Sequence, residues 1–197
     1  MRFPRLILAS QSPRRRLLLK QIGLRFTVRP SKVEEVFSSR ESPRSNARRI
    51  ALEKAREVAR NVSHGIVVAA DTIVVVDDKI LGKPRTKKEA RAMLMKLSGR
   101  EHIVYTGFAL VDARSGRSMA GVERTRVRFR RLDPKEVAGY VGSGAPMDKA
   151  GAYGIQDDYG AVFVEKVDGC FYNVVGFPLA RFYSTLTEFI RLLEKRV

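Results

Sequence analysis

The stretch Arg5-Leu-Ile-Leu-Ala-Ser-Gln-Ser-Pro-Arg-Arg-Arg16 combines an apolar run, a polar turn and the start of a helix. Its apolar residues 6–9 predict a short buried strand. Ser12 is a favoured N-cap, and Pro13 suits the first helical position, where its missing N–H would be unpaired anyway. A strand leading into a capped helix places free N–H groups and the positive end of the helix dipole together, which favours phosphate. A capped surface helix with a solvated basic first turn explains these residues equally well.

The totals describe one globular chain of ordinary composition. Its 197 residues suffice for one substantial core, and 44% hydrophobic and 30% charged residues are typical of a soluble protein. No apolar run approaches the ~20 residues of a membrane helix, and no secretory signal is visible. The single cysteine, Cys170, excludes an internal disulfide and fits a reducing compartment. We expect a cytoplasmic protein without a membrane partner.

The charge balance is strongly basic, with 38 Lys and Arg against 21 Asp and Glu and a net charge of +17. Nucleic-acid binding, binding of small polyanions such as nucleotides, and basicity for solubility all explain this total. The segment 124–130 alternates arginines on one face with Thr125, Val127 and Phe129 on the other. No aromatic residues interleave with the arginines, so a solvated face is favoured and nucleic acid is not the expected partner.

A helix predicted from Ser42-Pro43 to about Asn61 carries a charge on its inner face. The inner row is Ala47, Ile50, Ala51, Lys54 and Val58. A lysine rarely takes a core position unless an anion or carboxylate lies there. A lysine that snorkels to the edge of the stripe is the alternative.

Acidic residues supply a partner for that lysine. Residues 65–70 are small and apolar, as in a buried central strand, and Asp71-Thr72 is expected to end it before an apolar pattern resumes at 73–76. Beside Glu34 and Glu35, Asp71 would complete a carboxylate cluster suited to Mg²⁺ or Mn²⁺. A lone Asp that forms a turn between two strands is the alternative.

The order of elements predicts an α/β fold with a mixed twisted sheet and flanking helices. A hairpin over 101–130 interrupts the alternation of strands and helices, and helices are expected at 86–97, 133–141 and from 178 onward. The long segment 142–158, rich in glycine and polar residues, is expected to carry a site, and a strand is expected at 161–167. We expect a single domain over 1–197.

The chemistry that fits these residues is metal-assisted attack of water on a phosphoanhydride. A Walker P-loop, a GxSxG elbow and a Cys–His pairing are all missing from the sequence. A metal would neutralise phosphate oxygens, a carboxylate would deprotonate the water, and Lys and Arg would stabilise the leaving group.

At this point the chain resembles the Maf family, nucleoside triphosphate pyrophosphatases once described as septum-formation inhibitors. The landmarks of the resemblance are Leu8-Ala-Ser-Gln-Ser-Pro-Arg-Arg15, Glu53-Lys-Ala55, Ala70-Asp-Thr72, Gly82-Lys-Pro84, Leu97-Ser-Gly99, Tyr105-Thr-Gly107, Asp148-Lys-Ala-Gly-Ala-Tyr-Gly-Ile-Gln156 and Val175-Gly-Phe-Pro-Leu179. The resemblance implies a fold similar to that of inosine triphosphate pyrophosphatases, with two lobes around a nucleotide cleft. It implies hydrolysis of a triphosphate to the monophosphate and pyrophosphate with a divalent metal, Mg²⁺ or Mn²⁺.

The resemblance also implies roles for particular residues. The run ending at Gln156 is similar to the subgroup that acts on dTTP and UTP, and modified pyrimidine nucleotides stay open as substrates. The implied roles are Asp71 as proton acceptor; Arg14, Thr72 and Gln156 as specificity positions; Ser10, Arg15, Lys54, Lys83 and Lys149 near the phosphates; and Glu34, Glu35 and Asp71 at the metal. A homodimer stays open, as do a nucleic-acid-binding protein and a regulatory factor in cell division as alternative functions.

Overall fold

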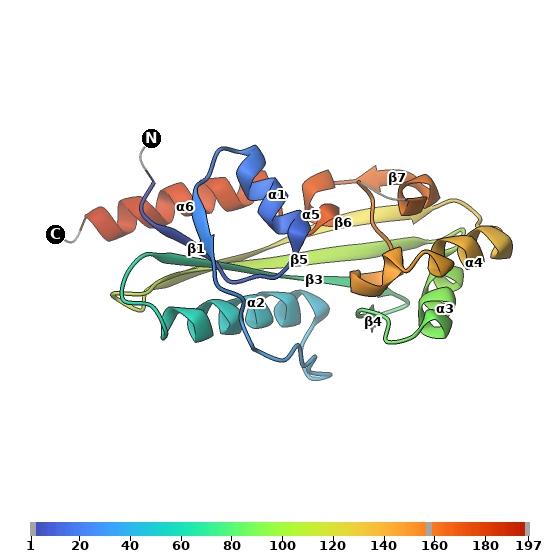
Figure 1. The fold of residues 1–197 in the computed structure, drawn as a ribbon, viewed down its shortest axis with the longest axis horizontal. Helices are drawn as coiled ribbons and strands as arrows, with labels where there is room; N and C mark the ends of the chain where they lie inside the picture. Colours follow the sequence, from blue (N-terminus) through green and yellow to red (C-terminus); the bar gives the residue numbers. More distant parts are fainter. Residues whose placement is uncertain (1–2, 157–158, 196–197) are drawn as a thin grey trace. The chain divides into compact units, whose positions relative to one another are not determined.

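The computed structural model describes residues 3–156 and 159–195, in which strands and helices make up a mixed α/β fold (Figure 1). The strand order is β2-β1-β3-β5-β6-β7, with β4 paired to β3. The strands are β1 (Leu6–Leu8), β2 (Phe26–Val28), β3 (Ile66–Val76), β4 (Lys79–Leu81), β5 (Glu101–Asp112), β6 (Ser118–Phe129) and β7 (Val164–Asp168). Strand β1 pairs in parallel with β2 and β3, whereas the pairs β3–β4 and β6–β7 are antiparallel. The predicted mixed sheet is confirmed.

Helices flank the strands as expected from the capping signals. The α-helices are α1 (Pro13–Gln21), α2 (Pro43–Ala59), α3 (Lys87–Leu97), α4 (Pro134–Gly142), α5 (Phe171–Val175) and α6 (Leu179–Glu194), and the short 3₁₀ helices are η1 (Ala145–Asp148), η2 (Ala150–Ala152) and η3 (Tyr159–Phe163). No helix among the described residues is both long and apolar enough to cross a membrane.

Internal contacts divide the chain into two compact units. The first unit comprises Met1–Asp71, Thr106–Glu123 and Gly176–Val197, and the second comprises Thr72–Tyr105 and Arg124–Val175. Each unit is therefore assembled from segments far apart in the sequence, and β3, β5 and β6 each contribute residues to both. The single domain expected over 1–197 stays a prediction.

In the first unit, both predicted cap-and-proline signals start helices. The Ser12 hydroxyl accepts a hydrogen bond from Arg15 N in α1, and the Ser42 hydroxyl accepts one from Ser45 N in α2. Gly23, with φ of 75°, follows the end of α1, since glycine enters the left-handed region without strain. The predicted inner row of α2, Lys54 included, is buried.

Strand β3 corrects one prediction, because it runs without a break from Ile66 to Val76. Asp71 therefore lies inside a strand and not at its end, and it is buried. A buried cation satisfies one of its oxygens, as described below, so the strand continues through it. A hairpin turn at Asp77-Asp78, with φ angles of 48° and 57°, joins β3 to β4.

The second unit confirms its predicted helices with one correction of detail. Thr86 caps α3, and the Glu89 carboxylate accepts from Arg85 N. A complete capping box starts α4 at Asp133 and Glu136. The strand predicted at 161–167 begins only at Val164, because the residues before it form η3.

An aromatic cluster in the second unit anchors the segment 148–156. The Tyr153 ring lies 4.7 Å from that of Phe129, and its hydroxyl lies 2.7 Å from His102 Nε2. Burial lowers the pKa of His102 to about 4, so the imidazole is neutral at physiological pH. Tyr140 Oη also accepts a hydrogen bond from Gly154 N. The predicted site-bearing segment is thus held to the core at Tyr153 and Gly154.

Candidate active site

The centre of the candidate site in the first unit is the ammonium group of Lys54, which joins two carboxylates. Lys54 Nζ lies 2.7 Å from Asp71 Oδ1 and 2.7 Å from Glu35 Oε1. The Lys54 and Asp71 side chains are only 9% and 3% exposed, whereas that of Glu35 is 35% exposed. Helix α2 supplies Lys54 and strand β3 supplies Asp71. The inward lysine therefore meets carboxylates, as its position predicts, and does not snorkel.

Asp71 combines one satisfied carboxylate oxygen with one unsatisfied oxygen. Its Oδ1 accepts from Lys54, while its buried Oδ2 has no hydrogen-bond partner among the described residues. Burial raises the pKa of the Asp71 carboxyl, the positive charge of Lys54 opposes that rise, and the negative charge of Glu35 adds to it. A carboxylate of raised basicity with a free oxygen is suited to accept a proton from water.

Arg15 is fixed at the start of α1 by two contacts. Its Nε donates to Gly176 O at 3.0 Å and its Nη1 donates to Ser10 Oγ at 3.2 Å. Burial lowers the pKa of the Arg15 guanidinium, and the negative charges of Asp71 and Glu35 counteract this effect. The structure thus brings Arg15 into the electrostatic environment of the two carboxylates. Arg14, also in the first turn of α1, is half-buried.

The predicted cluster of three metal-binding carboxylates is not formed. No group of three His, Cys, Asp or Glu side chains within residues 3–156 and 159–195 is placed to hold a metal. Glu35 and Asp71 share Lys54, whereas Glu34 is exposed. The reason is local: Glu34 and Glu35 are neighbours in an irregular segment, and only Glu35 turns its carboxylate to α2.

The predicted residues of the second unit lie on two linked segments. Gly151 N donates to Gly82 O at 3.0 Å, which joins the segment of Lys149 to the loop of Lys83. Lys83 is exposed, whereas Lys149 is buried and donates to Ala145 O and to Asp148. These contacts give Lys149 a role in the conformation of its own segment. The phosphate-binding roles of both lysines stay predictions.

Gln156 stands out because its buried amide group has no hydrogen-bond partner within residues 3–156 and 159–195. Neither Oε1 nor Nε2 makes a hydrogen bond to any other described residue. An unsatisfied buried amide is costly, and a ligand that supplied the missing partners would remove this cost. Thr72, the other predicted specificity position of this unit, is half-buried directly after Asp71 in β3.

Two residues of α2 that sequence reasoning missed hold the segment that carries Glu35. Asn46 is fully buried, and Arg49 Nη2 donates to Val36 O at 2.9 Å. Asn46 falls on the buried row of the helix, four residues before Ile50 and eight before Lys54. A polar residue on that row is the signal that would have found it.

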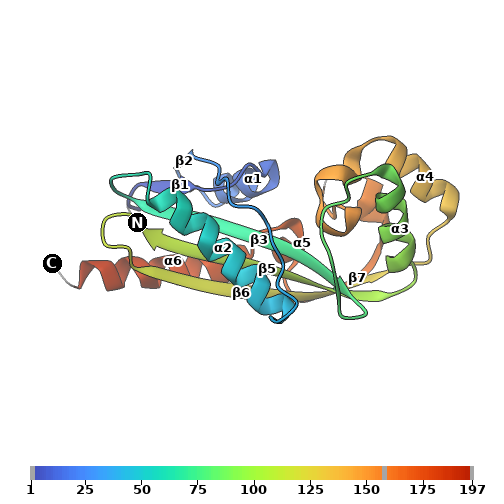
Figure 2. The same cartoon turned by 90° about the horizontal axis from the view of Figure 1, so that it is seen from below.

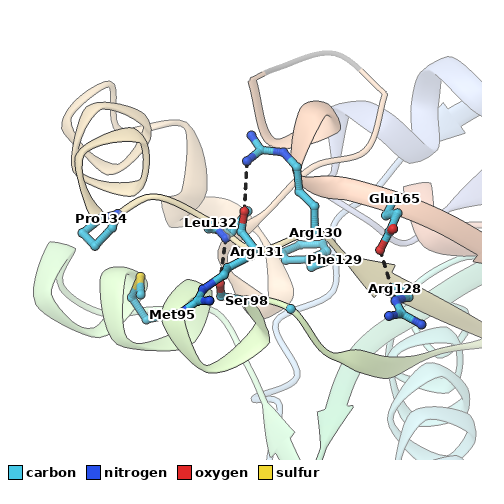
Figure 3. Close-up of a pocket in the computed structure, with 10 residues that line it drawn as sticks. Met95, Ser98, Arg128, Phe129, Arg130, Arg131, Leu132, Pro134 and Glu165 are labelled. Atoms are coloured by element: carbon cyan, nitrogen blue, oxygen red, sulfur yellow. Dashed lines mark hydrogen bonds and ion pairs between the residues drawn. The ribbon is translucent and has the colours of Figure 1, made fainter.

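Arg128 of β6 and Arg130, which directly follows β6, contact acids, as expected for a solvated face. Arg128 lies 3.1 Å from Glu165, and Arg130 donates to Glu136 and to the Arg131 carbonyl. Arg128, Arg130 and Glu165 line a cavity of about 760 Å³ in the second unit (Figure 3). None of the predicted site residues lines this cavity. Arg128 and Arg130 thus bind neighbouring protein groups.

Comparisons with known proteins agree with the landmarks of the sequence. Residues 5–189 match the family model described as Maf-like protein. The chain is 50% identical over 181 residues to the dTTP/UTP pyrophosphatase of Syntrophomonas wolfei, covering 92% of this chain and 95% of that protein. It is 49% identical over 185 residues to the dTTP/UTP pyrophosphatase of Carboxydothermus hydrogenoformans, covering 93% and 98%.

A solved structure supports the fold alone. A HAM1 protein from Coxiella burnetii superposes with a TM-score of 0.55 at 17% identity, covering 93% of this chain and 98% of that one. The α/β architecture is thus shared beyond close sequence relatives. Because the family model covers most of the chain and the relatives match it nearly end to end, the chain belongs to the Maf family.

Proposed function

We propose that this chain hydrolyses dTTP and UTP to the nucleoside monophosphate and pyrophosphate. The observation that carries the proposal is the buried Asp71 carboxylate, with one oxygen bound to Lys54 and the other without a partner among the described residues. Two relatives of this chain that are named dTTP/UTP pyrophosphatase support the substrate class. They are 50% and 49% identical to it over more than 90% of its length. Cleavage occurs between the α- and β-phosphates, since the products are a monophosphate and pyrophosphate.

The proposed reaction gives the charged groups of the candidate site, Asp71, Lys54 and Arg15, one role each. Asp71 accepts a proton from the attacking water, and Lys54 keeps the Asp71 carboxyl ionised. Arg15, oriented by Ser10 and by the Gly176 carbonyl, binds phosphate oxygens and stabilises charge on the leaving pyrophosphate. Lys83 and Lys149 are proposed as further phosphate contacts. The protein thus contributes positioning and electrostatics, the main requirements of phosphoryl-group chemistry.

Two carboxylates of the first unit, Glu35 and Asp71, share Lys54 and are the acceptors proposed to face a divalent cation. Asp71 Oδ2 is a buried acceptor without a partner among the described residues, and the Glu35 carboxylate faces the same lysine. Carboxylate oxygens are the protein ligands that Mg²⁺ and Mn²⁺ prefer, usually together with substrate phosphates. We therefore propose Glu35 as the residue that would hold the metal, with Glu34 and Asp71 as outer contacts, which leaves Asp71 Oδ2 to accept the proton. Such a metal neutralises charge on the phosphate oxygens.

The identity of the products tests the proposed reaction. Incubation of the protein with dTTP or UTP and Mg²⁺ should release monophosphate and pyrophosphate in equal amounts, as measured by ion-exchange chromatography. Modified pyrimidine and purine triphosphates in the same assay define the substrate range. Release of diphosphate and orthophosphate would contradict the proposed cleavage position.

Gln156 is expected to read the base. A glutamine amide has a donor and acceptors that match the imide edge of uracil or thymine. Gln156→Ala should therefore lower kcat/KM for dTTP and UTP by about 10- to 100-fold, the value of one or two lost hydrogen bonds. Purine triphosphates should lose less, so the measured preference for pyrimidines should shrink. Gln21→Ala, which removes an exposed glutamine at the end of α1, is the matched control. An equal loss for all nucleotides would refute a role in base recognition.

Arg14 and Thr72 are proposed as further specificity positions.

Lys54 is expected to set the pH dependence. Burial raises the pKa of Asp71 and Lys54 opposes this rise. In Lys54→Met the pKa of Asp71 should rise further, so the base is protonated at a higher pH. The acid limb of the kcat/KM profile should accordingly move to higher pH, with a lower plateau. Lys166→Met, which removes an exposed lysine of β7, should leave the profile unchanged. An acid limb that stays in place would show that Asp71 and Lys54 are not coupled in the reaction.

A further inference from the structure

The irregular segment 31–41, between β2 and α2, forms hydrogen bonds to successive residues along α2. Figure 2 shows this segment alongside the helix. Lys32 N donates to Glu57, Glu35 binds Lys54, Val36 O accepts from Arg49 and Ser38 N donates to Asn46. As the segment advances, its partners on the helix step back from 57 to 46. The segment therefore runs antiparallel to α2, and Glu35 lies in the middle of the fastened stretch.

Asn46 makes the densest set of these contacts. Its Nδ2 lies 2.9 Å from Ser38 O, 3.1 Å from Glu41 O and 3.2 Å from Ser42 O, and its Oδ1 accepts from Ser38 N at 2.7 Å. The side chain is 0% exposed. The buried amide thus binds backbone groups of the irregular segment and of the N-cap residue of α2.

Arg49 continues the set toward Glu35. Its Nη2 donates both to Asn46 Oδ1 at 2.8 Å and to Val36 O at 2.9 Å, one peptide unit from Glu35. Glu41 at 2.8 Å and Glu53 at 3.1 Å orient the guanidinium from the other sides. Arg49 is thus held by three side chains while it binds the backbone next to Glu35. Glu53, the first residue of the landmark Glu53-Lys-Ala55, thus orients Arg49 and takes no part in the proposed reaction itself.

We propose that Asn46 and Arg49 form a clamp that positions Glu35 for its contact with Lys54 in the reaction. The proposal rests on the proposed function, because Glu35 is there a metal-holding residue. Neither clamp residue is assigned a catalytic role, since their contacts are to the protein backbone, to each other and, for Arg49, to Glu41 and Glu53. The clamp fixes the backbone on the C-terminal side of Glu35 at Val36 and Ser38, and the Lys32–Glu57 contact fixes its N-terminal side.

A double-mutant cycle between Asn46→Ala and Glu35→Gln tests this mechanism. If Asn46 acts through Glu35, Asn46→Ala alone should lower kcat/KM for dTTP by about 10- to 100-fold, yet by less than about 3-fold in the Glu35→Gln background. The concentration of Mg²⁺ for half-maximal rate should rise in both single variants. A merely structural role for Asn46 would give losses that multiply and an unchanged Mg²⁺ requirement, and either result would overturn the proposal.

Two further variants separate positioning from folding. Arg49→Gln removes the hydrogen bond to Val36 O. Because the Arg49 side chain is partly exposed, this variant tests the clamp even where Asn46→Ala fails to fold. Its effect on kcat/KM should show the same non-additivity with Glu35→Gln. Asn61→Ala, which removes an asparagine bound to Glu57 O near the end of α2, is the matched control with no expected effect.

Hydrogen exchange provides a readout that is independent of activity. Asn46→Ala and Arg49→Gln should speed exchange of the Ser38 amide and its neighbours, whereas Glu35→Gln should not. Unchanged exchange at Ser38 in Asn46→Ala would overturn the clamp. A wild-type protein without activity on any nucleoside triphosphate would instead refute the proposed function, and the exchange data would then decide on the clamp by themselves.

Discussion

Asp71→Asn is expected to lower the turnover of dTTP and UTP at least ~10³-fold, within the range for loss of a general base. Asparagine is nearly isosteric with aspartate and keeps an oxygen for Lys54, but its amide cannot accept a proton from water. The fold should be preserved. Because burial raises the pKa of Asp71, ionisation of this group costs stability as pH rises through that pKa, and the neutral amide removes the cost.

The measurement is release of pyrophosphate at saturating nucleotide, together with the thermal unfolding midpoint of the same preparation. A midpoint within about 5 °C of wild type would establish that the loss is chemical. Asp77→Asn is the matched control, since Asp77 is an exposed turn residue with φ of 48°, which asparagine tolerates. It should retain full activity. Near wild-type turnover in Asp71→Asn would remove Asp71 from the role of base.

The sequence predicted the chemical partners at this site better than their backbone positions. Helical periodicity placed Lys54 on the buried row of α2, and the cost of a buried ammonium required an anion there. The same logic treated Asp71 as the end of a strand, because an isolated carboxylate interrupts an apolar run. The pairing that makes an acid tolerable inside β3 comes from another element, so it is invisible in the local pattern.

Irregular segments set the limit of prediction. Helices and strands have a period that assigns each side chain to a face, whereas residues 31–41 have none. Two adjacent glutamates at 34 and 35 therefore looked equivalent, and only tertiary contacts from α2 decide that Glu35 faces Lys54. For the same reason the clamp residues were missed: Asn46 and Arg49 act on backbone groups of a segment whose path the sequence does not specify.

Gly107 is a landmark residue whose structural role follows from the packing of β5 against α2. The resemblance names Tyr105-Thr-Gly107 without a role for the glycine. In the structure a Cβ added at Gly107 would lie 2.2 Å from Ala47 O, 2.4 Å from Ala47 C and 2.6 Å from Arg48 N. All three atoms belong to the backbone of α2, so no side-chain rotation could relieve the clash. Strand β5 and helix α2 approach each other this closely only because position 107 has no side chain.

Gly107→Ala is therefore expected to destabilise the protein by roughly 3 kcal/mol or more, as overpacking against backbone does. Any shift of α2 that relieves the clash also moves Lys54, which lies two turns beyond Ala47 on the same row, so the protein that still folds should lose activity. Urea unfolding followed by circular dichroism measures the first effect. Gly139→Ala is the matched control, because it lies in the exposed middle of α4 and nothing is near the added Cβ. It should be neutral or stabilise the protein by up to about 1 kcal/mol, since alanine favours the helix.

Equal stability of Gly107→Ala and wild type would contradict the close packing of α2 against β5 at this point. The contact between Lys54 and Asp71 would then not depend on Gly107.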